Sequence, residues 1–241
     1  AIPDAVPRHE PRSRYGNPAS YVVFGKRYHV MPTSAGYVER GIASWYGTKF
    51  HGHRTSSGET YDMYAMTAAH KSLPLPTYAR VTNLRNGRSV VVKINDRGPF
   101  HDNRIVDLSY AAAARLGILG QGTGLVEVRA VQPGAAPNQT APGPRVIEAR
   151  ASTPPAPPPA AAAGPSLYLQ VGAFQSRTNA EQLTSRLRQV PLPDIHISQG
   201  VSDRRPVYRV RIGPLASVAE ADRVAAELGS HGIANPHVVI D

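Results

Sequence analysis

A stretch rich in proline and alanine divides this chain into two parts. Segment 132–165 contains ten Pro and ten Ala among its 34 residues. Proline lacks an amide donor and fixes φ, so the segment cannot build a packed core and favours a solvated, partly polyproline-II tether. Its reach is about 100 Å if stiff, or about 30 Å r.m.s. as a flexible coil. We therefore expect an N-terminal extension over 1–35 and folded modules over 36–131 and 166–241.

The composition excludes several classes of protein. A net charge of +10 favours polyanionic partners. The positive charge is spread along the chain, however, whereas a nucleic-acid interface needs a concentrated stripe, so no nucleic-acid partner is expected. The chain has no cysteine, which removes disulfides and thiolate metal sites. No apolar run approaches the ~20 residues of a membrane span.

The C-terminal module shows one pattern twice, a strand followed by a capped helix. Thr178 with Glu181 forms a capping box for a helix through about Val190, and Ser217 with Glu220 caps a second helix that ends near Gly229. Strands are expected at 167–174, 195–197, 207–212 and 237–240. The order βαββαβ indicates a ferredoxin-like unit with one open sheet face.

The first module is mostly β. Strands are expected at 78–83, 89–95 and 125–130, with a hairpin turn at 86–87 and a further hairpin around 21–31. One short helix should begin after Ser109 and stop at Gly117. Together these elements favour a small barrel.

Polar residues gather between positions 44 and 107 of this module. Cleavage of a glycosidic bond needs a carboxylic acid to protonate the leaving oxygen, and Glu59 or Asp96 could supply it, with His70 tuning the proton. The pattern alone leaves other roles open. Asp96 also suits a turn cap, Glu59 a solvated loop, and His70 a hydrogen-bonded structural position. The pair Trp45-Tyr46 fits a core as well as a sugar platform.

His51-x-His53 is a known zinc-ligand spacing, and His70, Glu59 or Asp96 could be further ligands. No HExxH helix or cysteine set supports it. The chain also lacks a Gly-x-Ser-x-Gly elbow and a phosphate-binding loop. We therefore expect neither a metal nor a cofactor.

Five segments together resemble the rare lipoprotein A family of septal-ring lytic transglycosylases, over about 20–131. They are GIASWYG at 41–47, TSSGE at 55–59, AMTAAH at 65–70, LPLP at 73–76 and NDRGPF at 95–100. The resemblance implies a double-psi β-barrel whose catalytic candidates are Glu59, His70 and Asp96. The substrate-binding candidates in the barrel are Trp45, Tyr46, Ser57 and Arg97.

Segments 170–174 and 208–214 resemble a SPOR domain, a βαββαβ unit that recognises septal glycan strands lacking stem peptides. Strand alternation places Leu169, Val171, Val210 and Ile212 toward the helices. The substrate-binding candidates in this module are Gln170, Phe174, Tyr208, Arg209 and Arg211. An ordinary solvated face is the alternative for the two arginines. RNA binding is disfavoured because the aromatic signature of RNA-binding sheets is absent.

The resemblance thus implies cleavage of the MurNAc–GlcNAc bond in peptide-free peptidoglycan strands, leaving 1,6-anhydro-MurNAc, with Asp96 as general acid and Glu59 and His70 assisting. It also implies a periplasmic location at the division septum, with division-site proteins as partners. The family is usually lipidated on an N-terminal cysteine, so outer-membrane attachment would need an anchor that this chain does not contain. The alternative function is a non-catalytic, expansin-like glycan-binding scaffold. In the leading hypothesis, the tether lets the SPOR-like module hold a strand while the barrel cuts it.

Overall fold

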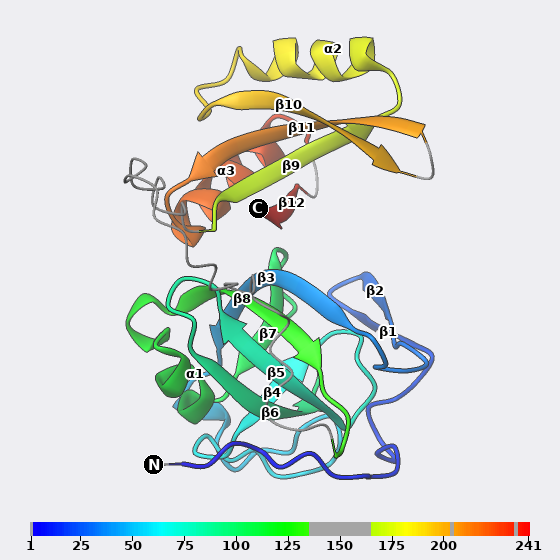
Figure 1. Ribbon diagram of the computed structural model, residues 1–241, viewed down its shortest axis with the longest axis vertical. Helices are drawn as coiled ribbons and strands as arrows, with labels where there is room; N and C mark the ends of the chain where they lie inside the picture. Colours follow the sequence, from blue (N-terminus) through cyan, green and yellow to red (C-terminus); the bar gives the residue numbers. More distant parts are fainter. Residues whose placement is uncertain (1, 135–164, 203–204, 234–235) are drawn as a thin grey trace, which may run out of the picture.

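The computed structural model describes residues 2–134, 165–202, 205–233 and 236–241 (Figure 1). Most of the expected tether, 135–164, lies outside the described residues. Within the described part, no helix is both long and apolar enough to span a membrane.

The first module is a closed six-stranded barrel with strand order β3-β7-β4-β6-β5-β8 (Figure 1). Its strands are β3 (Val38–Trp45), β4 (Thr67–His70), β5 (Thr77–Asn83), β6 (Ser89–Asp96), β7 (Arg104–Leu108) and β8 (Thr123–Ala130). The pairs β3–β7 and β4–β6 are parallel, and the other four are antiparallel. The expected β-barrel is confirmed.

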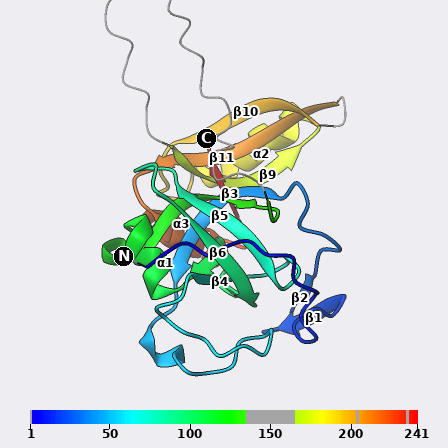
Figure 2. The same ribbon diagram turned by 60° about the horizontal axis from the view of Figure 1, so that its bottom comes forward.

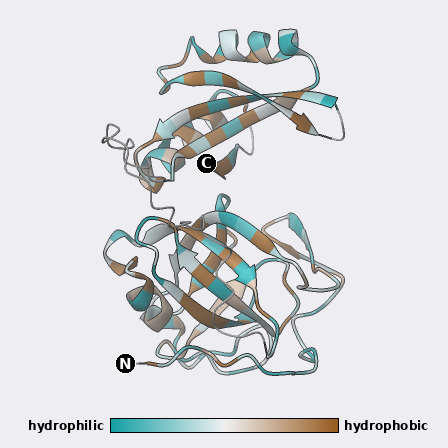
Figure 3. Ribbon diagram, in the orientation of Figure 1, coloured by the Kyte–Doolittle hydropathy of each residue, from teal (hydrophilic) through white to brown (hydrophobic). Residues whose placement is uncertain are grey.

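Small and branched apolar side chains fill the barrel. Hydrophobic and hydrophilic residues alternate along the strands, as the colours of Figure 3 show. Helix α1 (Tyr110–Leu116) packs against this core, and its ends lie where the sequence predicts them. The Ser109 hydroxyl accepts a hydrogen bond from the Ala112 amide, and Gly117 ends the helix with φ of 73°. Short 3₁₀ turns, η1 (Thr48–Phe50) and η2 (Leu119–Gln121), lie in the connections.

The N-terminal extension lies against the barrel. Its backbone bonds to β6 through Ala5 N to Val91 O at 3.0 Å, and to the loop before β5 through Ser13 N to Leu75 O at 2.8 Å. The expected hairpin forms from β1 (Ser20–Val23) and β2 (Lys26–His29). It projects from one side of the barrel (Figures 1 and 2).

The C-terminal module has the expected βαββαβ order. Its elements are β9 (Leu167–Phe174), α2 (Arg177–Leu187), β10 (Ile195–Ser202), β11 (Arg205–Leu215), α3 (Val218–Ser230) and β12 (His237–Ile240). The antiparallel sheet has order β10-β11-β9-β12. The Ser217 hydroxyl caps α3 as expected, whereas α2 begins after Ser176 without a side-chain cap and ends three residues before Val190.

A register shift in β9 changes which side chains share a face. Gln170 pairs with Arg211, but Gly172 pairs with Val210, so Val171 is the extra residue of a bulge. Beyond the bulge, Phe174 pairs with Tyr208 on the helix-covered side, where both rings pack against the apolar core. The strict alternation expected for β9 therefore stops at Val171.

The two modules pack against each other, with β12 lying beside β3 (Figure 1). Ile42 and Leu125 are paired neighbours on β3 and β8, and they are 0% and 1% exposed. Both belong to one apolar cluster with Leu167 and Leu215 of the C-terminal module. An Arg85 guanidinium N–H also donates to the Ala216 carbonyl at 3.3 Å.

Candidate active site

Two aspartates lie on either side of a small residue across adjacent strands of the barrel. Asp107 on β7 pairs with Ala69 on β4, and Ala69 pairs in turn with Asp96 on β6. Because neighbouring strands are about 4.8 Å apart, the Cα atoms of the two aspartates are roughly 10 Å apart. Ala69 between them leaves space for a ligand.

This space is a pocket of about 250 Å³ lined by both aspartates. Tyr46, Phe50 and Tyr61 form an aromatic wall, with the Tyr46 and Tyr61 ring centroids 4.4 Å apart. Gly98 lies close to the row of aspartates: a Cβ on it would be 3.8 Å from the Ala69 Cβ and 3.9 Å from Asp107 Oδ2. Aromatic walls with a few convergent polar groups are typical of a ligand-binding pocket.

Asp96 has one occupied and one available oxygen. Its Oδ1 accepts hydrogen bonds from the Ser56 amide at 2.8 Å, the Ser56 hydroxyl at 2.6 Å and the Arg97 amide at 2.8 Å. These bonds fix the carboxylate, and no described residue donates to Oδ2. Three donors on one oxygen arrange Asp96 as a proton acceptor.

Asp107 is partly buried, and its carboxyl contacts a neighbouring strand. Its Oδ1 accepts a hydrogen bond from the Ser44 hydroxyl on the neighbouring strand β3. Burial raises the pKa of the Asp107 carboxyl, while the Ser44 hydrogen bond and the charges of Arg104 and Lys71 oppose this effect. A carboxyl with a raised pKa in a pocket is suited to hold a proton for transfer.

Tyr46 and Trp45 are neighbours in the chain but lie in different surroundings. Tyr46 lines the pocket, and burial, together with the nearby Asp96 carboxylate, raises the pKa of its hydroxyl. Trp45 instead packs against the barrel core, edge-on to Tyr110 at 5.8 Å. Of the two residues, Tyr46 lines the pocket and Trp45 does not.

Glu59 lies beside the pocket rather than in its wall. Its Oε1 accepts from Lys93 Nζ at 2.7 Å and its Oε2 from Asn95 Nδ2 at 2.8 Å. The Lys93 amine also binds Glu10 of the N-terminal extension at 2.8 Å. Both Glu59 oxygens are therefore engaged with β6, close to Asp96 in sequence.

His70 is buried and its ring is neutral. Nδ1 accepts hydrogen bonds from the amides of Ser72 at 3.1 Å and Leu73 at 3.0 Å, so the ring proton lies on Nε2, 2.7 Å from the Tyr37 hydroxyl. The Tyr37 hydroxyl donates in turn to Glu39. Burial, reinforced by the charges of Arg97 and Lys71, lowers the pKa of His70 to about 3. The imidazole lies outside the residues that line the pocket.

The structure gives Arg97 and Ser57 supporting contacts. The Arg97 guanidinium donates to the carbonyls of Gly16 at 2.8 Å, His70 at 3.1 Å and Leu73 at 2.6 Å. The Ser57 hydroxyl lies 3.0 Å from the Thr55 hydroxyl, and it is the preceding residue, Ser56, that contacts Asp96.

His51 and His70, two of the possible zinc ligands, lie in separate surroundings. His51 Nδ1 accepts from the Met63 amide at 3.2 Å, while His70 is enclosed as described above. Among the described residues, no group of three His, Cys, Asp or Glu side chains could hold a metal ion.

Polar side chains form a row across the open face of the C-terminal sheet. Arg211 on β11 pairs with Gln170 on β9, which pairs with His237 on β12. Arg209 shares this face and lies over Gly200, whereas Arg211 is paired with Asp241. Phe174 and Tyr208 lie on the opposite, helix-covered side.

Sequence reasoning missed Asp107, Ser44 and Ser56. Asp107 lies inside a strand, where Asp is depleted, and a carboxyl between apolar strand residues was the signal that could have found it. Ser44 and Ser56 lie inside the segments GIASWYG and TSSGE, but nothing in those segments indicates that their hydroxyls contact the aspartates. The pairing of strands distant in sequence brings all three residues together.

Comparisons with known proteins cover both modules. A family model described as "Lytic transglycolase" matches residues 38–129, and the SPOR domain model matches residues 163–239. The "Endolytic peptidoglycan transglycosylase RlpA" of Pseudomonas aeruginosa strain UCBPP-PA14 is 42% identical, over 99% of this chain and 80% of that protein. The protein of the same name from Neisseria meningitidis strain Z2491 is 41% identical, over 94% of this chain and 86% of its own length. A crystal structure of the RlpA SPOR domain from Pseudomonas aeruginosa is 36% identical, with a TM-score of 0.29, and covers 30% of this chain and 96% of that one.

Proposed function

This chain belongs to the rare lipoprotein A family of lytic transglycosylases, and we propose on this basis that it cleaves the MurNAc–GlcNAc bond of peptidoglycan strands that lack stem peptides. The observation that carries the proposal is the pair of aspartates facing one pocket beside an aromatic wall. Two carboxyl groups around a sugar-sized space are the machinery that glycosidic cleavage needs.

The environments of the two carboxyls divide the proton transfers between them. Asp107, whose pKa is raised by burial, donates a proton to the leaving oxygen of GlcNAc. The MurNAc 6-hydroxyl attacks C1, and Asp96 Oδ2 accepts the hydroxyl proton. One C–O bond breaks and another forms, giving a 1,6-anhydro end without consuming water. The nucleophile belongs to the same sugar, so little entropy is lost in bringing it to C1.

This assignment keeps Asp96 at the reacting centre but gives the general-acid role to Asp107. Glu59 and His70 become positioning residues. Glu59 holds Asn95, next to Asp96, through a 2.8 Å hydrogen bond. His70 orders the loop after β4 through two backbone amides, and its carbonyl receives a hydrogen bond from Arg97.

The C-terminal module supplies a second contact with the glycan strand, in addition to the pocket of the barrel. We propose that its open face binds peptide-free glycan through Gln170, Arg209 and Arg211. Peptidoglycan as substrate places the protein in the cell envelope. A periplasmic site at the division septum, with division-site proteins as partners, completes the proposal.

Product analysis on peptide-free glycan strands tests the reaction. Mass spectrometry should find 1,6-anhydro-MurNAc ends for the parent, and a loss of at least about 10²-fold in rate for Asp96→Asn and Asp107→Asn. Asp62→Asn is the matched control because its carboxylate is exposed and lies outside the pocket. Reducing ends would show a hydrolase, and strand binding without any product would show a non-catalytic scaffold.

A substrate with an activated leaving group separates the two carboxyl roles. An aryl glycoside of MurNAc needs little protonation of its leaving oxygen, so it should restore much of the activity of Asp107→Asn but not that of Asp96→Asn. The reverse result would return the general-acid role to Asp96.

A further inference from the structure

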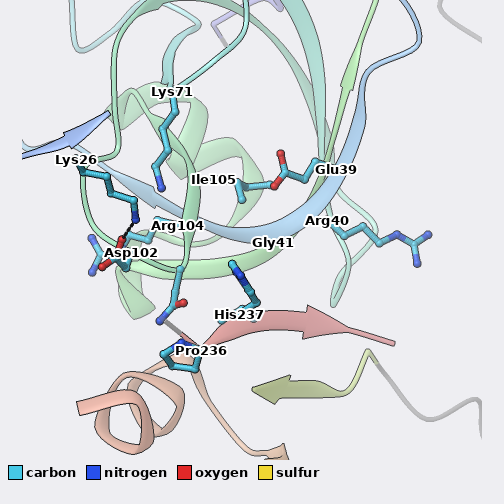
Figure 4. A pocket seen from close by; sticks show the side chains of 12 residues that line it. Lys26, Glu39, Arg40, Gly41, Lys71, Asp102, Arg104, Ile105, Pro236 and His237 are labelled. Carbon is cyan, nitrogen blue, oxygen red and sulfur yellow. Dashed lines mark hydrogen bonds and ion pairs between the residues drawn. The ribbon is translucent and has the colours of Figure 1, made fainter. Parts of the chain in front are cut away.

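A second pocket lies between the two modules (Figure 4). This pocket, the cleft, has a volume of about 230 Å³. The N-terminal hairpin contributes Lys26 of β2, and the barrel contributes residues of β3, β7 and the adjoining loops. The C-terminal module contributes 236–238 around the start of β12. The apolar contact around Ile42 and Leu125 holds the two walls together.

Positive charge predominates in the cleft. Lys26, Arg40, Lys71 and Arg104 line it, against the carboxylates of Glu39 and Asp102. Lys26 Nζ pairs with Asp102 at 2.5 Å (Figure 4), and Arg40 pairs with Glu127 outside the cleft.

Lys71 and Arg104 remain without a partner carboxylate. Neither forms an ion pair with any residue in the described ranges. The Lys71 amine donates to the His101 carbonyl at 3.1 Å, and burial together with the charge of Lys26 lowers its pKa. The carboxylates of Asp102, Glu39 and Asp107 act on Lys71 without forming an ion pair with it, and a half-buried cation without a contacting carboxylate gains stability from an anionic ligand.

The cleft adjoins both glycan-contacting surfaces of the proposed function. His237 lines it and is also the end of the row that runs through Gln170 and Arg211 on the open sheet face. On the barrel side, Arg104 precedes Asp107 by three residues along β7, which is about 10 Å. Both Arg104 and Lys71 are near enough to act on the Asp107 carboxyl. A glycan strand bound to the open sheet face can therefore extend through the cleft to the pocket that contains the two aspartates.

We propose that the cleft is a carboxylate-binding subsite in which Lys71 and Arg104 hold the lactyl carboxylate of a MurNAc residue near the cleavage site, an inference that rests on the proposed function. In a strand without stem peptides this carboxylate is free. A stem peptide converts it to an amide and removes its charge. The cleft thus gives the barrel its own means of selecting peptide-free strands, in addition to the SPOR-like face.

Binding to chemically modified strands tests this subsite. Peptide-free strands are compared with the same strands after their lactyl carboxyls have been coupled to methylamine, using the full chain with Asp96→Asn so that no strand is consumed. We expect the unmodified strands to bind about tenfold more tightly, the effect of one charge-assisted hydrogen bond. The added substitutions Lys71→Gln and Arg104→Gln should abolish this difference and leave binding of the amidated strands unchanged.

Two further variants control for charge and folding. Arg88→Gln with Arg186→Gln removes two positive charges from exposed positions outside the cleft and should keep the tenfold difference. Lys71→Arg with Arg104→Lys keeps both charges and should retain most of the tenfold difference in affinity. The subsite would be overturned if the parent bound unmodified and amidated strands with equal affinity. It would also be overturned if Lys71→Gln with Arg104→Gln weakened the binding of both kinds of strand equally. Failure of the proposed reaction would appear separately, as absent product from the enzyme with Asp96 intact.

Discussion

At the scale of single residues, the three polar groups of the family motif serve different purposes. Asp96 presents one free oxygen to the pocket, Glu59 uses both oxygens to bind β6, and His70 uses both nitrogens inside the barrel wall. Protonating His70 would place an N–H at Nδ1 against two amide donors. The ring is therefore kept neutral by its hydrogen bonds as well as by its burial.

The His70 ring makes stability depend on pH. Its pKa is about 3 in the folded chain, against an ordinary 6.5, so between these values the unfolded chain binds a proton that the folded chain does not. The free energy of unfolding should therefore decrease as pH falls from 6.5 toward 3, by about a few kcal/mol in all. Denaturant titrations at several pH values measure this slope. His70→Gln should reduce the slope of the free energy of unfolding against pH. An unchanged slope in this variant would show that other groups cause it.

At the scale of elements, the N-terminal extension supports the loop that holds Asp96. Gly16, with φ of 77°, lies against Ser56, the residue whose amide and hydroxyl bind the Asp96 carboxylate. The Gly16 carbonyl also accepts a hydrogen bond from Arg97 at 2.8 Å. The extension thus belongs to the active-site scaffold.

Adding one methyl group to Gly16 tests this support. A Cβ there would lie 2.7 Å from the Ser56 carbonyl oxygen, whereas a Cβ on Gly36, with φ of 72°, meets nothing within 4 Å. Both Gly16→Ala and Gly36→Ala should lose about 1–2 kcal/mol of stability from the left-handed backbone. Only Gly16→Ala should also lower kcat on peptide-free strands. Equal kcat values for the two variants would show that Asp96 does not depend on the extension.

The sequence predicts elements better than it predicts the faces they share. Helix α1 follows from two local residues, Ser109 and Gly117, and its boundaries are confirmed. Phe174 lies on the helix side because a one-residue bulge at Val171 reverses the alternation of β9, and no local pattern marks that bulge. Tyr208 lies on the same side by the ordinary alternation of β11, two residues before the buried Val210. Asp107 joins Asp96 only through the β7–β4–β6 pairing, which depends on how the barrel closes. Local signals do not encode such non-local register.

At the scale of the whole molecule, the two modules are more than tethered neighbours. Ile42 and Leu125 point outward from the barrel, yet both are fully buried in a cluster shared with the C-terminal module. Burying each side chain contributes about 1.5–3 kcal/mol. The two modules are therefore held together by a packed apolar contact as well as by the chain that joins them.

A charge placed in this contact should release the modules from each other. Leu125→Glu puts a carboxylate into a site that is 1% exposed, and its desolvation is unfavourable unless the modules separate. Small-angle X-ray scattering should then show a larger radius of gyration, since a linker of 34 residues, if flexible as its sequence predicts, would allow a separation of about 30 Å r.m.s.. Val38→Glu, on the same barrel but at a side chain that is 44% exposed, should leave the radius unchanged. A parent already as extended as Leu125→Glu would mean that the modules act as independent units, joined only through segment 132–165.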